Sequence, residues 1–116
     1  MKGGDLYWVE LLSRGGHTQT GRRPALIAQA AAVSTAVPTV LIIPLTTQQD
    51  ALRFPGTLLI EADQLNRLPR TSVALVFQLT AIDQRHLRER LGAVSAAVMG
   101  SVWQVFDEIT DRHGPH

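Results

Sequence analysis

The sequence predicts a mainly β domain, a small curved antiparallel sheet or barrel that ends in one helix. Up to residue 93, short apolar runs of strand length alternate with polar stretches that contain Gly and Pro. Only the segment from Val94 to Ile109 repeats its apolar residues with helical spacing. Because many strands precede a single helix, this order favours an antiparallel sheet over an alternating α/β fold. The 116 residues fit one domain, with residues 111–116 expected as a frayed tail.

The first two strands are expected on either side of a polar loop. DLYWVELL, residues 5–12, is apolar and aromatic with partial alternation, and SRGG ends it with turn residues. Proline biases the residue before it toward extended geometry, so Arg23-Pro24 starts a second strand that continues through ALIAQ. The AAAVSTA segment that follows fits either a helical turn or a loop.

Further apolar segments complete the predicted sheet. TVLIIPL, residues 39–45, is nearly all apolar, as in a centrally buried strand, and Pro44 predicts a bulge or an edge near its end. A long polar loop, 46–56, separates it from the strand TLLIEA. TSVALVFQLTAID, residues 71–83, fits one long strand or two abutting ones, and 83–92 fits a helical turn before an edge strand.

The C-terminal helix has one apolar face and a suitable capping residue. Ser95 is expected to cap its N-terminus, without a capping box because residue 98 is valine. The apolar face must cover the sheet or a second subunit. Its members are Val94, Val98, Val102, Val105, Phe106 and Ile109.

Composition excludes several classes of protein. The chain has no cysteine, hence no disulfide or zinc–thiolate site, and no apolar run near the roughly 20 residues that a membrane span needs. The N-terminus lacks the apolar core of a secretory signal, so a cytoplasmic location is expected. Motifs of phosphate loops, dinucleotide-binding proteins, serine hydrolases and zinc proteases are absent. No metal is expected, because none of the histidines has metal-ligand spacing: His17, His86, His113 and His116.

The segment between Glu10 and Asp50 carries positive charge only. Between Glu10 and Asp50 there is no acidic residue, whereas Arg14, Arg22 and Arg23 lie in this interval. All but one of the 11 basic residues are arginine, whose planar fork binds phosphate through two hydrogen bonds. Either the protein binds an anionic partner or the arginines only reflect a GC-rich coding sequence.

Two polar loops, GGHTQTGRRP and PLTTQQ, stand at the ends of apolar strands, where a rigid sheet can position them. Their side chains can hold a phosphodiester. Arg23 would bind phosphate oxygens, Thr46 a third oxygen or the attacking hydroxyl, and Gln19 or Gln48 the sugar or base. The alternative interpretation is a pair of solvated turns.

These same residues make the chain resemble the MazF/PemK toxins, the ribosome-independent endoribonucleases of type II toxin–antitoxin systems. The matching pieces follow the family's order and cover nearly the whole chain: GDLYWVEL, GHTQTGRRPALI, PLTTQ, TLLIEA and SVALVFQLTAIDQRHLRERLG. The resemblance implies an SH3-barrel-like curved antiparallel sheet of the MazF/CcdB type with a C-terminal helix. It also implies a cytoplasmic homodimer that cleaves single-stranded RNA such as mRNA at short preferred sequences, inhibits growth and needs no cofactor. The implied partner is an acidic, MazE-like antitoxin, and the complex of the two binds DNA.

The resemblance assigns catalysis to Arg23 and Thr46. Further positions are candidate RNA contacts, some matched to the family and some from the same two loops: Gln19, Arg22, Thr47, Gln48, Ser72 and Gln78. RNA can be cleaved by its own 2′-hydroxyl, which leaves a cyclic phosphate and a free 5′-hydroxyl, so the protein need only orient, neutralise and move protons. Arg23 is expected to stabilise charge first and to donate a proton second, because a guanidinium rarely gives one up.

The chain departs from the family at two positions. Thr18 stands where many members carry an acidic residue, and His86 stands in place of a usual arginine. His17, which titrates near neutral pH, is a candidate to replace the missing carboxylate in catalysis, the alternative being a solvated loop histidine. Two other functions stay open: a CcdB-like protein that poisons DNA gyrase without cutting RNA, and a catalytically silent homologue that only binds an antitoxin.

Overall fold

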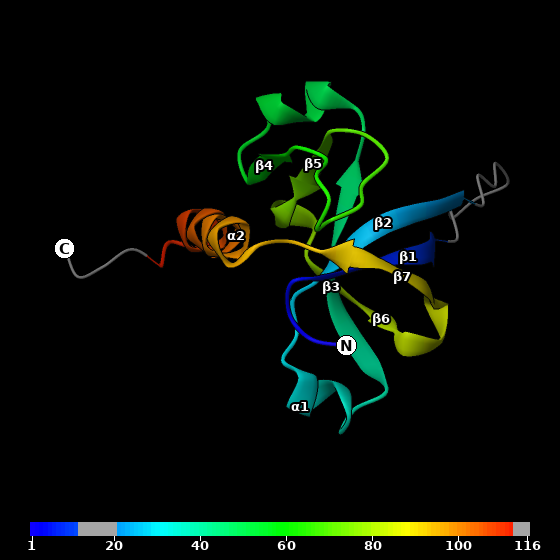
Figure 1. The fold of residues 1–116 in the computed structure, drawn as a ribbon. Helices are drawn as coiled ribbons and strands as arrows, with labels where there is room; N and C mark the ends of the chain where they lie inside the picture. The colour runs from blue at the N-terminus through cyan, green and yellow to red at the C-terminus, as the bar shows by residue number, and fades with distance from the viewer. Residues whose placement is uncertain (12–20, 113–116) are drawn as a thin grey trace, which may run out of the picture.

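The computed structural model describes residues 1–11 and 21–112 (Figure 1). The predictions for His17, Thr18, Gln19 and the end of the tail therefore lie outside the described residues. The strands are β1 Asp5–Leu11, β2 Gly21–Ile27, β3 Thr39–Thr46, β4 Thr57–Ile60, β5 Ser72–Leu75, β6 Thr80–Asp83 and β7 Leu87–Ala93. The helices are α1 Ala31–Ser34 and α2 Ala96–Ile109, and the short 3₁₀ turns are η1 Gln49–Arg53, η2 Val76–Gln78 and η3 Gln84–His86.

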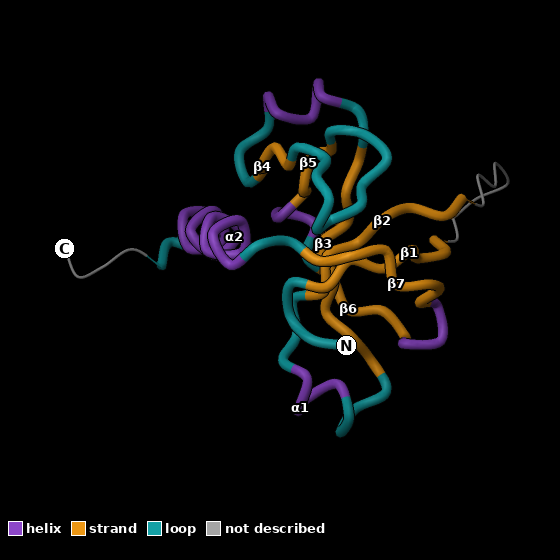
Figure 2. Tube along the Cα trace, viewed as in Figure 1, coloured by secondary structure: helices purple, strands orange, loops and turns teal. Residues whose placement is uncertain are grey.

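The described strands form one antiparallel sheet (Figure 2). Strand β3 pairs with β2 along one edge and with two different strands, β6 and β5, along its other edge. The first half of β3, Thr39–Ile42, pairs with β6, whereas Leu45 and Thr46 pair with β5. Pro44 lies where the partner changes, as suits a residue without a backbone N–H. The order is β4-β5-β3-β2-β1-β7, and the sheet is open because its outer strands β4 and β7 do not pair with each other.

The predicted fold class, mainly β with a C-terminal helix, is confirmed. The structure also decides the open alternatives. The 71–83 segment forms two strands, β5 and β6, separated by η2. The segment after β2 contains the short helix α1, and the 83–92 segment contains the turn η3 followed by the edge strand β7.

Apolar side chains are buried on both faces of the central strands, which explains why β2 and β3 are nearly continuous apolar runs. One cluster lies between the sheet and α2, with Leu26 and Ile43 at most 1% exposed. The other lies on the opposite face around Ile27 and Ile42.

Helix α2 follows the predicted pattern. The Val98 amide donates to Oγ of the N-cap Ser95 (3.1 Å). Val102 is fully buried, and Val98, Val105 and Phe106 pack against the same core. Within the described residues, no helix is long and apolar enough to cross a membrane.

The loop of residues 61–70 is fixed in place by the buried side chain of Asn66. Its Oδ1 accepts hydrogen bonds from the amides of Asp63 (3.0 Å) and Leu68 (2.9 Å), and its Nδ2 donates to the Glu61 carbonyl (2.9 Å). The backbone of this loop lies directly against Gly92 of β7, where an added Cβ would stand 2.6 Å from the carbonyl oxygens of Leu65 and Asn66. The loop can approach β7 this closely only because residue 92 has no side chain.

Candidate functional site

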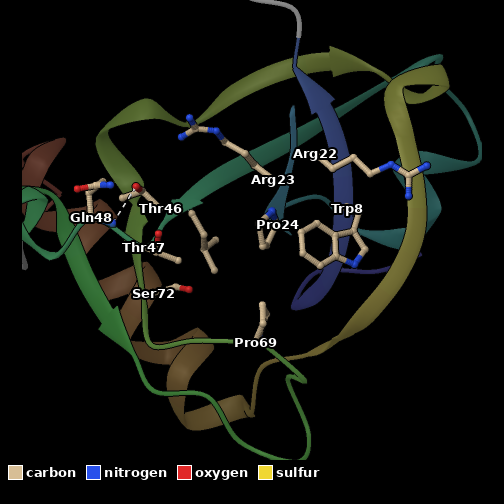
Figure 3. A pocket seen from close by; sticks show the side chains of 10 residues that line it. Trp8, Arg22, Arg23, Pro24, Thr46, Thr47, Gln48, Pro69 and Ser72 are labelled. Atoms are coloured by element: carbon tan, nitrogen blue, oxygen red, sulfur yellow. Dashed lines mark hydrogen bonds between the residues drawn. The ribbon is translucent and has the colours of Figure 1, made fainter. Parts of the chain in front are cut away.

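A hollow of about 250 Å³ lies over β1, β2 and the end of β3 (Figure 3). The strand register explains how distant residues meet there. Trp8 of β1 stands opposite Pro24 of β2, while Thr46 at the end of β3 pairs with Val73, directly after Ser72. The lining residues are Trp8, Arg22, Arg23, Pro24, Leu45, Thr46, Thr47, Gln48, Pro69 and Ser72.

The two adjacent arginines differ in their partners. Arg22 Nη1 lies 2.9 and 2.8 Å from the two carboxylate oxygens of Glu89 on β7. Among the described residues, the Arg23 guanidinium has no hydrogen-bond or ion-pair partner. Figure 3 shows the two side chains extending in different directions. Arg23 is therefore the cation whose donors are available to an anion in the hollow.

Two arginines of β7 form ion pairs with acidic side chains, unlike Arg23. Arg88 pairs with Glu10, and Arg90 pairs with the buried Asp5 at 3.3 Å, so both link β7 to β1. Their charge is neutralised within the sheet rather than presented to a ligand.

The Thr46 hydroxyl is oriented by a turn. The backbone N–H of Gln48 donates to Thr46 Oγ1 (3.1 Å), as the dashed line in Figure 3 marks. A threonine oxygen that accepts this bond still has its own hydrogen to donate. Thr46 can therefore donate to an oxygen atom of a ligand that Arg23 also binds.

The Ser72 hydroxyl also lines the hollow, but its hydrogen is already used in a hydrogen bond within the protein. Ser72 is 2% exposed, and its Oγ donates to the Arg70 carbonyl at 3.0 Å. Because its hydrogen is used within the protein, Ser72 can only accept from a ligand. The hollow thus combines a guanidinium without a partner in residues 1–11 and 21–112, a hydroxyl donor and a buried hydroxyl acceptor.

The family model of the PemK-like, MazF-like toxins of type II toxin–antitoxin systems matches residues 2–110. The chain belongs to this family. Curated relatives include Endoribonuclease MazF of Staphylococcus saprophyticus, 30% identical over 107 residues, which cover 92% of this chain and 88% of the relative. Endoribonuclease EndoA of Bacillus subtilis is 28% identical, with 88% and 87% covered.

Solved MazF structures share the fold. The crystal structure of MazF from Deinococcus radiodurans has a TM-score of 0.75 and 27% identity, covering 96% of both chains. A MazE–MazF crystal structure from the same organism has a TM-score of 0.78 at 24% identity, covering 97% of both chains. The open antiparallel sheet with a C-terminal helix is thus the fold of the MazF toxins.

The structure of this MazF-like chain brings most of the predicted site residues together. Six of them line the hollow: Arg22, Arg23, Thr46, Thr47, Gln48 and Ser72. Gln78 lies in η2, exposed, and does not line it, and neither does His86 in η3. No group of three or more His, Asp or Glu side chains within residues 1–11 and 21–112 is arranged to hold a metal ion.

Sequence reasoning missed the apolar part of the hollow. Trp8, Pro24, Leu45 and Pro69 line it beside the polar residues. Trp8 and Leu45 belong to apolar segments for which the sequence predicts buried strands. Pro69 belongs to a loop in which the sequence shows no functional motif. The one available signal was the position of Trp8 on the strand that pairs with Arg23-Pro24.

Glu89 remains ionised throughout the ordinary pH range of an RNA assay. A hydrogen bond from its own backbone amide lowers the pKa of Glu89 below its usual value, and the Arg22 guanidinium lowers it further. A lowered pKa in the folded state means that the Glu89 carboxylate is charged at neutral pH and loses its charge only as the pH falls through that pKa. At neutral pH the Arg22 guanidinium therefore faces a charged Glu89 carboxylate.

Replacing Glu89 by glutamine is expected to strengthen binding of single-stranded nucleic acid in this MazF-like protein. The change removes a negative charge beside the hollow and frees Arg22 for one more phosphate. Each added phosphate contact steepens the dependence of log K on log salt by about 0.7 for single strands. Titration with a fluorescent DNA oligonucleotide, which lacks the 2′-hydroxyl, measures this slope. Glu108→Gln, the same change on the exposed surface of α2, is the control, and an equal effect of both variants would contradict a role for Arg22.

Proposed function

We propose that this protein is the toxin of a toxin–antitoxin pair and cleaves single-stranded RNA without a metal ion. The observation that carries the proposal is that one hollow is lined by both the Arg23 guanidinium, which has no partner among the described residues, and the Thr46 hydroxyl, which can donate a hydrogen bond. The names of the relatives, endoribonucleases MazF and EndoA, support the same activity.

The reaction that fits this site uses the substrate's own nucleophile. The 2′-oxygen attacks the adjacent phosphorus, an O2′–P bond forms, and the P–O5′ bond breaks, which leaves a 2′,3′-cyclic phosphate and a 5′-hydroxyl. One proton leaves O2′ and another reaches O5′, so the overall charge is conserved. Arg23 and Thr46 would bind the non-bridging oxygens, on which charge builds up in the transition state, and stabilise it there. His17 stays our candidate for moving one of the protons.

The partners follow from the same site. The stretch without acidic residues between Glu10 and Asp50 gives an acidic antitoxin segment an electrostatic reason to cover it. A MazE–MazF structure from D. radiodurans and a mycobacterial endoribonuclease in complex with its cognate antitoxin have similar folds, which supports an antitoxin as the partner. We place the protein in the cytoplasm, where mRNA and a co-expressed antitoxin are present, and expect it to be a homodimer.

Incubation of the purified protein with a long RNA in EDTA tests this function. Fragments that end in a cyclic phosphate and begin with a 5′-hydroxyl are expected, because the 2′-hydroxyl rather than a metal-bound water attacks. Thr46→Val should slow cleavage by about tenfold or more, as the loss of one hydrogen bond to a charged group is worth roughly 1.5–3 kcal/mol. Thr39→Val, at the opposite end of the same strand, is the control. RNA that stays intact, or equal rates for the two variants, would overturn the assignment.

A further inference from the structure

We propose that the apolar side of the hollow binds one nucleobase of the RNA, stacked on the indole ring of Trp8. This inference rests on the proposed function, since it assigns a second part of the substrate to the same site. It adds the recognition of a base to the recognition of the phosphate by Arg23 and Thr46.

The hollow is divided into a polar and an apolar side. Figure 3 shows Thr46, Thr47 and Ser72 on one side, and the indole of Trp8 with Pro24 and Pro69 on the other. The register of β1 and β2 holds Trp8 opposite Pro24, and Leu45, only 1% exposed, adds a buried apolar surface. Pro69 comes from the 61–70 loop, which Asn66 and the contact with Gly92 hold in place.

The Trp8 ring is available to a ligand. It is half-buried, and among the described residues it has neither a stacked aromatic ring nor a cation over it, nor a hydrogen-bond acceptor for its indole N–H. The strand and the two prolines fix its surroundings, so little conformational entropy is lost when a flat ring stacks on it.

The charges beside this ring identify the ligand class. A nucleotide unit is an anionic phosphate joined to a flat, weakly polar ring, and the hollow offers the matching pair of surfaces: Arg23 with Thr46, and Trp8 with the prolines. Its volume of about 250 Å³ is below the roughly 300–1,000 Å³ of pockets that enclose drug-sized ligands. It therefore suits one base rather than several. Stacking on aromatic side chains is the general way in which proteins hold unpaired bases.

The fluorescence of Trp8 reports base stacking directly. The chain has 2 tryptophans, and the other, Trp103, lies on α2 against Phe106. The Trp103→Phe variant leaves Trp8 as the only indole. It is titrated at low salt with a short single-stranded DNA, which lacks the 2′-hydroxyl, and with an abasic strand of the same number of phosphates.

Quenching by the base-bearing strand and little or no quenching by the abasic strand is the expected result. Equal quenching by both strands would mean that only the backbone binds near Trp8, and no quenching by either at saturation would mean that Trp8 contacts neither. Both results overturn the inference. RNA cleavage without base-dependent quenching would overturn this inference alone, whereas intact RNA would overturn the proposed function.

Cleavage by substituted proteins provides a second, independent test. Trp8→Phe keeps a flat ring and should retain most of the activity, whereas Trp8→Leu should lower kcat/KM by about 5- to 150-fold, as for the loss of one base–aromatic stack. Trp103→Leu on α2 is the matched control. The urea midpoint of each variant shows whether it is folded, and the Trp8→Phe protein separates loss of stacking from loss of packing. Equal kcat/KM for Trp8→Leu and Trp8→Phe, both folded, would contradict the proposal.

Discussion

RNA cleavage by Arg23→Ala is expected to be about 10²–10³-fold slower than by the wild-type protein, the cost of removing one preorganised donor from a charge-stabilising site. Arg23 is exposed at the surface end of β2 and has no partner among the described residues, so its loss leaves the packing of the sheet unchanged. The urea midpoint should therefore stay close to that of the wild type. Initial rates on a defined RNA, with fragment ends mapped, measure the effect.

Two further substitutions show which property of Arg23 matters. Arg23→Lys keeps the charge but loses the planar fork, so it should recover only part of the rate. Arg22→Ala removes an equally charged neighbour that Glu89 already neutralises, and a much smaller loss is expected. If Arg22→Ala and Arg23→Ala slow the reaction equally, the site works through net positive charge and not through a particular guanidinium.

Gly92→Ala is expected to destabilise the fold by about 1–3 kcal/mol, the usual cost of forcing an extra carbon into a packed region. The new Cβ would lie 2.6 Å from two backbone oxygens of the 61–70 loop, and backbone cannot rotate away as the end of a side chain can. The loop must therefore move away from β7. Because Pro69 lines the hollow, RNA binding should weaken together with stability. Urea denaturation and nucleic-acid titration of the same preparation measure both effects.

Gly100→Ala is the matched control for this change. Gly100 lies on the exposed side of α2, and nothing stands within 4 Å of an added Cβ there. Alanine in the interior of a helix is more stable than glycine by roughly 0.5–1 kcal/mol, so this variant should be slightly more stable than the wild type. A destabilisation of similar size in both variants would show that the contact at Gly92 is not the cause.

Local sequence patterns were sufficient to predict the strands, the capped helix and the position of Arg23. Each depends on neighbours in the chain: alternation or apolar runs, a serine before a helical repeat, and an arginine before the proline that starts a strand. The choice between one and two strands in 71–83 was not local. It depends on β3, whose change of partner at Pro44 separates β5 from β6.

The rest of the site depends on contacts between distant segments. Arg22 meets Glu89, 67 positions away, only because β2, β1 and β7 lie side by side. The sequence predicts Trp8 as a core residue of its strand. Its position beside the hollow follows from the pairing of β1 with β2, which places it opposite Pro24, and from Pro69, which lines the same hollow. Ser72 was predicted from the family resemblance. The hydrogen bond from its hydroxyl to the Arg70 carbonyl, which leaves Ser72 able only to accept, is visible only in the structure.

The division of β3 between two partners determines when the hollow can be completed during synthesis. Arg23 and Thr46 come from the early strands β2 and β3, whereas Pro69 and Ser72 reach the hollow only when β5 pairs with the end of β3. The loop that carries Pro69 is in turn held against Gly92 of β7, near the C-terminal end of the sheet. A chain still emerging from the ribosome thus contains Arg23 and Thr46 long before it contains every residue that lines the hollow. Nearly the whole domain must therefore be synthesised before the hollow is complete.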